Sequence, residues 1–191
     1  DGNGVHFLSH KEQQVMRRFY HDVNDKEGIH SNSIYSLLVD DRGAVWVGHF
    51  QAGLDYSLYQ NGLFRTYAYP PQFNSTNLSI RSFVNRGKEK VIGSRDGLFY
   101  INESIGVVKS FVKPVLTSDL ILTTCFYQGE YYIGTYGGGM MVLNPETLSL
   151  NYFAQGDTEL FQRGHVFCVK PDTKGNLWIG TSQGLYSYNG R

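Results

Sequence analysis

The chain has 191 residues, and its 17 basic and 17 acidic side chains give a formal net charge of zero at neutral pH. Neither sign gathers in a run, which excludes the electrostatic footprint of a nucleic-acid-binding or membrane-surface protein and favours uncharged or locally recognised partners. Aromatic residues reach 15%, and 22 glycines accompany five prolines, which is typical of many short strands joined by tight turns.

The first twenty residues predict the end of a propeller blade. Gly4 to Leu8 has the composition of a third strand, and Gln14 to Tyr20 that of a fourth, outer strand. No stretch approaches the ~18 apolar residues of a membrane helix, and the opening residues do not resemble a signal peptide. Any export signal or membrane anchor is therefore expected outside this chain.

A repeated unit follows. Its anchoring glycines, Gly48, Gly93, Gly134 and Gly180, are spaced 45, 41 and 46 residues apart, within the range of a four-stranded propeller blade. In each unit an aliphatic residue and a small residue two places later mark the innermost strand, and a Gly-containing tight turn leads to the second strand. The predicted blades are 32–68, 79–112, 119–154 and 164–191, the last without its outer strand.

The predicted fold class is all-β, with four nearly complete blades of four antiparallel strands plus part of a fifth, in one partial propeller over residues 1–191. The seventeen predicted strands are one more than four closed blades need, so the chain is expected to be a fragment of a larger propeller. An open arc of blades exposes two blade faces and strand edges, which favours contact with adjacent blades of the parent propeller or homo-oligomers.

The repeat resembles the two-component regulator propeller repeat. The similarity is carried in the first full unit by Asp40, Gly43, Trp46 and Gly48, with Asn32, Ile34 and Gly53-Leu54, and in the last by Asp172, Gly175, Asn176 to Thr181 and Gly184-Leu185-Tyr186. In the two middle units Val91 and Tyr132 replace tryptophan, and the turn aspartate is missing.

This resemblance implies a ligand-sensing segment on the periplasmic side of a membrane-bound hybrid histidine kinase of the Bacteroidetes type, responding to oligosaccharides and without catalysis of its own. Similar repeats also occur in other propellers, including lyases. The alternatives are therefore a propeller enzyme, either a lyase or a glycan hydrolase, and a non-binding oligomerisation scaffold.

The predicted binding face carries the turns between second and third strands and the connections between blades. These segments are longer and richer in aromatic and polar groups than the turns at the opposite end of the blades, and loops on a rigid scaffold commonly bind ligands. The aromatic residues could instead plug the space between blades. The predicted ligand residues are His49, Phe50, Gln51, Arg95, Asp96, Tyr136 and Gln183, with Tyr69, Phe73 and Phe161 as further aromatic surfaces.

The sequence predicts no cofactor and no metal site. Cys125 and Cys168 have no Cys or His partner at ligand spacing, so two buried free thiols are expected. His30 and His165 are expected to tune loop packing. The acids on the predicted binding face, Asp96, Asp119, Asp157 and Glu159, fall at unrelated loop positions, whereas glycoside hydrolysis needs paired carboxylates.

Overall fold

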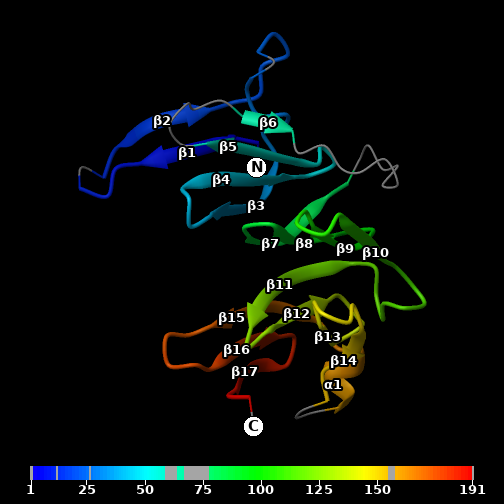
Figure 1. The fold of residues 1–191 in the computed structure, drawn as a ribbon. Helices are drawn as coiled ribbons and strands as arrows, with labels where there is room; N and C mark the ends of the chain where they lie inside the picture. The colour runs from blue at the N-terminus through cyan, green and yellow to red at the C-terminus, as the bar shows by residue number, and fades with distance from the viewer. Residues whose placement is uncertain are drawn as a thin grey trace. The chain divides into compact units, whose positions relative to one another are not determined.

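A computed structural model describes residues 2–11, 13–25, 27–58, 64–66, 78–154 and 158–190 (Figure 1). The chain divides into two compact units, Asp1–Ile80 and Arg81–Arg191, which are described separately. Unit 1 holds a two-stranded sheet, β1 (Val5–Leu8) and β2 (Val15–Phe19), and a four-stranded sheet, β3 (Ile34–Val39), β4 (Ala44–His49), β5 (Leu54–Leu58) and β6 (Phe64–Thr66).

The sheets of unit 2 have four, four and three strands. The first, which begins at the boundary between the units, contains β7 (Ile80–Arg86), β8 (Glu89–Ser94), β9 (Gly97–Asn102) and β10 (Val107–Phe111). The second contains β11 (Ile121–Tyr127), β12 (Glu130–Thr135), β13 (Met140–Leu143) and β14 (Leu150–Tyr152), and the third β15 (Val166–Pro171), β16 (Leu177–Thr181) and β17 (Gly184–Tyr188).

Within the described residues, seventeen strands form these five sheets, and inside each sheet every strand is hydrogen-bonded to the strand next to it in sequence. This simple up-and-down order is that of propeller blades. The predicted all-β fold class is confirmed.

One element departs from the expected loops. Between the predicted blades 119–154 and 164–191, Thr158–Arg163 form a helix, α1, while 155–157 lie outside the described residues. Leu160 and Phe161 are buried against β13 and β15, so the helix forms because it closes the core there. Among the residues that the structure describes, no helix is long and apolar enough to cross a bilayer.

Two hydrophobic cores fill the spaces between the three sheets of unit 2. One lies between β7–β10 and β11–β14 and includes Val91, Tyr100 and Ile133. The other lies between β11–β14 and β15–β17 and includes Tyr132 and Val169. Apolar side chains of facing sheets therefore supply the cohesion of the repeat.

The anchoring glycines mark the points where the next sheet approaches most closely. A Cβ atom on Gly134 would lie 2.6 Å from Thr123 Cγ2 and 2.7 Å from Val166 Cγ1. A Cβ on Gly93 would meet Ile121 Cγ2 at 2.5 Å. The glycine of the repeat is therefore required by packing between sheets.

The turn aspartate and the tryptophan of the repeat form one hydrogen-bonded unit. Oδ1 of Asp40 accepts from the amides of Arg42 and Ala44 at 3.0 and 2.9 Å, and Oδ2 accepts from Trp46 Nε1 at 3.1 Å. Burial alone would raise the pKa of this carboxyl, but these hydrogen bonds outweigh it and lower the pKa. Asp40 thus ties its turn to the second strand.

The last sheet repeats the same arrangement. Oδ1 of Asp172 accepts from the amides of Lys174 and Asn176, both at 2.8 Å, and Oδ2 accepts from Trp178 Nε1 at 2.9 Å. Hydrogen bonds from the Asn176 side chain and amide and from Trp178 lower the pKa of this carboxyl. The three donors follow the aspartate by two, four and six residues, so the whole motif can be recognised in a short stretch of sequence.

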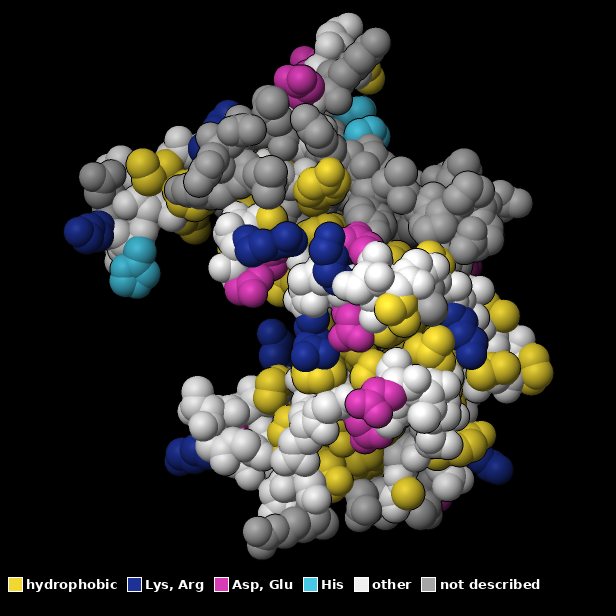
Figure 2. Space-filling view, in the orientation of Figure 1, with side chains coloured by type: hydrophobic (Ala, Val, Ile, Leu, Met, Phe, Trp, Pro, Cys, Tyr) yellow, Lys and Arg dark blue, Asp and Glu magenta, His cyan; other side chains and the backbone are white. Residues whose placement is uncertain are grey.

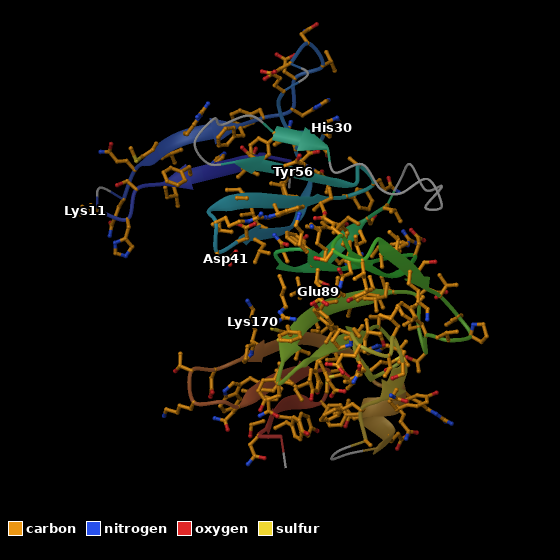
Figure 3. The ribbon with its side chains drawn as sticks, in the orientation of Figure 1. Lys11, His30, Asp41, Tyr56, Glu89 and Lys170 are labelled. Atoms are coloured by element: carbon orange, nitrogen blue, oxygen red, sulfur yellow. The ribbon has the colours of Figure 1, made fainter. Side chains whose placement is uncertain are left out.

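A different polar group occurs in the sheet β7–β10, one of the two middle units that lack this motif. Glu89, labelled in Figure 3, accepts hydrogen bonds from Tyr100 at 2.8 Å, Tyr131 at 3.1 Å and Arg86 at 3.0 Å. Because Tyr131 belongs to β12, Glu89 also links two adjacent sheets. The middle units therefore keep the architecture while losing the sequence motif.

Both cysteines are free, as predicted, but only Cys125 is buried. The expectation that Cys168 is buried was wrong. Cys168 lies on the face of β15 that no further sheet covers among the described residues, whereas the aligned Thr123 of β11 is covered by β15.

Replacing Asp40 with alanine should cost about 2 kcal/mol of unfolding free energy, because it removes the acceptor of the hydrogen bonds that the buried Trp46 ring and Ala44 amide donate. The matched variant Asp172→Ala should lower the melting temperature less, since Trp178 is 41% exposed against 4% for Trp46. Thermal denaturation of both variants measures the difference. Equal losses would show that the hydrogen bonds contribute independently of burial.

Candidate functional site

A β-bulge at the start of the innermost strands determines which side chains face solvent. Pairing skips one residue between Ile34 and Ser36 and between Val166 and Cys168. A bulge leaves its extra residue unpaired in the ladder and re-aims its side chain. Two of the skipped residues, Tyr35 and Phe167, are aromatic and about half exposed, whereas Leu122, skipped at the same place in β11, is partly buried.

In unit 2 the side chain that the bulge turns outward, Phe167, belongs to a row of three neighbouring rings. The Tyr136 ring, in the turn between β12 and β13, lies 4.0 Å from the His165 ring at an interplanar angle of 23°. His165 in turn lies 6.1 Å from Phe167 at 32°. Tyr136 and Phe167 are both half exposed. We call Tyr136, His165 and Phe167 the aromatic platform.

Unit 1 has a smaller counterpart. The rings of Tyr35 and Phe50 are 5.1 Å apart and tilted by 45°, and both are exposed. Phe50 takes the same place in its turn as Tyr136, two residues after the anchoring glycine. Each unit thus presents an aromatic surface where the second strand ends.

Backbone hydrogen bonds hold these turns against the innermost strands. The amide of Phe50 donates to Ser33 O at 3.0 Å, that of Tyr136 to Leu120 O at 3.0 Å, and that of Ser182 to His165 O at 3.1 Å. The platform is therefore positioned by the repeat itself, on a rigid part of the scaffold.

The predicted residues of unit 2 occupy equivalent turns in successive sheets. Arg95 and Asp96 are exposed between β8 and β9, Tyr136 between β12 and β13, and Gln183 between β16 and β17. These turns lie at the same end of their sheets because the sheets share one topology. No contact joins the side chains of Arg95, Asp96, Tyr136 and Gln183 to one another in the described part of unit 2.

In unit 1, Phe50 and Gln51 are exposed after β4, but the predicted ligand residue His49 is fully buried. His49 Nε2 lies 2.9 Å from Oδ2 of Asp55, which is also fully buried. His30, labelled in Figure 3, donates from its amide to Asp55 Oδ2 at 2.7 Å, and its Nδ1 lies 3.0 Å from Oδ1. In this structure His49 stabilises the sheet and is not available to a ligand.

Asp55 was not anticipated from sequence. Burial would raise its pKa, but the hydrogen bonds from His49 and from the His30 amide and the nearby imidazoles lower it overall. The sequence signal that could have identified Asp55 is its position six residues after His49, on the strand that pairs with β4.

Phe161 follows the second of its two predicted alternatives, a plug between blades. It is 2% exposed and packs edge-to-face on Phe153 at 5.1 Å, so it plugs the space between sheets. Tyr69 and Phe73 lie outside the described residues.

The candidate acids do not form a pair on one element. Asp96 is in a turn, Glu159 is in α1, and Asp119 accepts from the Lys113 amide at 2.7 Å; Asp157 is outside the described residues. Within the described ranges, no three His, Cys, Asp or Glu side chains are placed to hold a metal ion.

The family model for the two component regulator propeller matches residues 28–51 and 161–183. These ranges contain the two Asp–Trp pairs, Asp40 with Trp46 and Asp172 with Trp178. No curated protein matches the chain.

Several solved structures are similar. The extracellular domain of BT3049, described as a hybrid two component system of B. thetaiotaomicron, is 25% identical, with 92% of this chain and 25% of that chain covered and a TM-score of 0.69. The extracellular domain of BT4673, described as a one component system of the same organism, is 21% identical, with 97% and 24% covered and a TM-score of 0.74.

The computationally designed Ika4 protein is 16% identical, with 86% of this chain and 95% of that chain covered and a TM-score of 0.60. The matches to BT4673 and Ika4 show the fold alone. The chain spans about a quarter of the length of the two bacterial domains. Two segments of the chain, residues 28–51 and 161–183, thus match the two component regulator propeller, and the sheet architecture is similar to that of the extracellular domain of BT3049.

Proposed function

We propose that the chain is a ligand-sensing segment of an extracytoplasmic receptor domain, on the periplasmic side of a membrane-bound two-component histidine kinase, and that its ligand is an oligosaccharide. The proposal is supported by the likeness to extracellular domains of bacterial signalling systems. The observation that carries it is the solvent-exposed aromatic platform, held rigidly at the end of the sheets.

An aromatic platform suits a sugar because a pyranose ring has an apolar C–H face and hydroxyl groups around its edge. The exposed Tyr136 ring can cover the apolar face while its hydroxyl remains hydrogen-bonded to water or ligand. Arg95, Asp96 and Gln183, on equivalent turns, supply polar groups for an extended, uncharged chain of sugars. The balanced net charge agrees with such a ligand.

The segment is proposed to bind without catalysing a reaction. Hydrolysis or elimination at a glycosidic bond needs two acid–base groups that close on one bond. Asp119 is engaged with a backbone amide, and Asp96 and Glu159 stand on separate elements. Signalling would then be relayed by other parts of the receptor.

Tyr136→Ala should weaken oligosaccharide binding at least tenfold and leave the melting temperature nearly unchanged, because the ring is half exposed. Tyr152→Ala is the matched control, since Tyr152 is equally exposed but lies on the outer strand β14. A thermal-shift panel of oligosaccharides, followed by calorimetry on the best one, measures both. If no glycan shifts the protein, or if both variants bind alike, the proposal fails; turnover of a glycan would instead indicate an enzyme.

A further inference from the structure

His165 is the polar member of the aromatic platform and the residue directly before β15. Its ring contacts two rings that are more exposed than itself, Tyr136 at 4.0 Å and Phe167 at 6.1 Å. No ring contact joins Tyr136 to Phe167 in the described part of unit 2. The imidazole is therefore the central ring of the platform, and its two nitrogen atoms are the polar groups there.

The two ring nitrogens of His165 have different surroundings. Nδ1 is buried and has no hydrogen-bond partner among the described residues. Nε2 has no hydrogen bond to these residues either, but it is not buried, so it is the nitrogen that reaches solvent. A buried N–H group without an acceptor is costly, so the neutral ring carries its proton on Nε2. His165 therefore offers a hydrogen-bond donor at the centre of the platform.

The neighbouring turns hold this donor in place. Gly137 has a φ of +77°, and a Cβ atom on it would lie 3.7 Å from His165 Cε1 and 3.9 Å from Nδ1, so Gly137 lies beside the ring edge that includes Nδ1. The Gly139 amide donates to Gly164 O at 2.9 Å. The Ser182 amide donates to His165 O at 3.1 Å. Because two turns fix the backbone at the imidazole, the donor is positioned before any ligand binds.

The repeat does not require a ring at this position. The residue directly before the innermost strand is Ser33, Ser79 or Leu120 in the other three sheets that have such a strand. The carbonyl oxygens of Ser33 and Leu120 accept an amide hydrogen bond from the adjacent turn, as that of His165 does. The backbone role of the position is therefore independent of its side chain, and the sheet does not need the imidazole.

A fixed donor beside aromatic rings can distinguish sugars that apolar contact cannot. Figure 2 shows hydrophobic side chains at several places on the surface of unit 2, so apolar contact is not particular to the platform. Hexose epimers present nearly the same apolar C–H surface to a ring and differ in the direction of a hydroxyl group. A site built to hydrogen-bond one hydroxyl disfavours a sugar that lacks it there, because the protein donor is left unpaired.

We infer that His165 determines which hexose the platform accepts, by donating a hydrogen bond from Nε2 to one hydroxyl oxygen of the bound sugar. The inference rests on the proposed function, since it requires an oligosaccharide on the platform. Tyr136 and Phe167 supply the apolar contact that all hexoses share. His165 supplies the contact that depends on configuration.

Calorimetry with β-1,4-linked hexasaccharides of glucose, mannose and galactose tests the inference, since these sugars differ only in the configuration of one or two hydroxyl groups. The unmodified chain should prefer one of the three by about tenfold or more. His165→Phe keeps a ring and removes the donor, so it should weaken binding of the preferred hexasaccharide about tenfold and abolish most of the preference. His165→Gln keeps an N–H donor near the place of Nε2 and should retain the preference.

His10→Phe is the matched control, since His10 is an exposed histidine between β1 and β2, outside the platform, and its replacement should change neither affinity nor preference. The variants at His165 should remain folded, because its ring makes no hydrogen bond to the described residues, and thermal denaturation verifies this.

Nitrogen NMR of the imidazole in the unmodified chain should show the proton of the neutral ring on Nε2, and a proton on Nδ1 would overturn the inference. An unchanged preference in H165F would overturn it too, while leaving the proposed function intact. Failure of all three hexasaccharides to bind would also overturn it. The proposed function would fail with it only if no other glycan of the thermal-shift panel bound.

Discussion

Gly134→Ala is expected to cost about 3 kcal/mol of unfolding free energy and to lower the melting temperature by roughly 6–12 °C. The new methyl group would lie 2.6 Å from Thr123 Cγ2, 2.7 Å from Val166 Cγ1 and 2.9 Å from Val166 O. Since the last contact is with backbone, β12 and β15 must move apart, and the core between them loosens. Urea denaturation measures the loss.

Gly180→Ala is the internal control for this effect. It is the equivalent glycine of the last sheet, but the nearest atoms to its Cβ are Cys168 Cβ at 3.6 Å and Cys168 O at 3.9 Å, which are ordinary contacts. Its stability should change by less than about 0.5 kcal/mol. If both alanine variants lost the same stability, the glycine would be required by strand conformation and not by the approach of the next sheet.

Asp55→Ala is expected to cost about 3 kcal/mol at neutral pH, because it leaves the fully buried His49 ring and the His30 amide without their acceptor. The loss should depend on acidity. Since the folded-state pKa of Asp55 is lowered, its contribution is fully present above the unfolded value of about 4 and is lost progressively as the pH falls from there through the lowered folded-state pKa.

Stability of the unmodified chain and of Asp55→Ala, measured by urea denaturation from pH 7 down to pH 3, should therefore differ by a constant amount above about pH 4 and by a steadily smaller amount as the pH falls further. Asp41→Ala is the control, since Asp41 is an exposed turn residue, and its stability should follow the unmodified chain throughout. A difference between Asp55→Ala and the unmodified chain that does not shrink between pH 4 and pH 3 would show that the side chain acts by packing and not by charge.

Some of the exposed aromatic residues of the candidate site could be predicted from the sequence, and others could be found only in the structure. Spacing along the repeat was sufficient to place Tyr136 and Phe50 in solvent-exposed turns, because position relative to the anchoring glycine is a local property. Phe167 and Tyr35 were not identified, since an innermost strand read with period two gives no sign of the skipped pairing that turns them outward.

His49 was predicted to face a ligand, but the structure buries it. Its position directly after the glycine predicted a ligand-facing side chain, but the carboxylate of Asp55 on the neighbouring strand holds it in the core. Such a pairing depends on register between strands, and register is set by the whole sheet. The Glu89 hub likewise joins β8, β9 and β12, which no local motif connects.

By itself the sequence determined the all-β class, the order of the strands, the repeat and the turn chemistry, because alternation of apolar residues and glycine-containing turns are encoded within a few neighbouring residues. Only the tertiary structure decided which of these side chains are buried, which are re-aimed by a bulge and which face remains uncovered. Burial depends on the sheet that packs against a strand, and that sheet comes from a distant part of the chain.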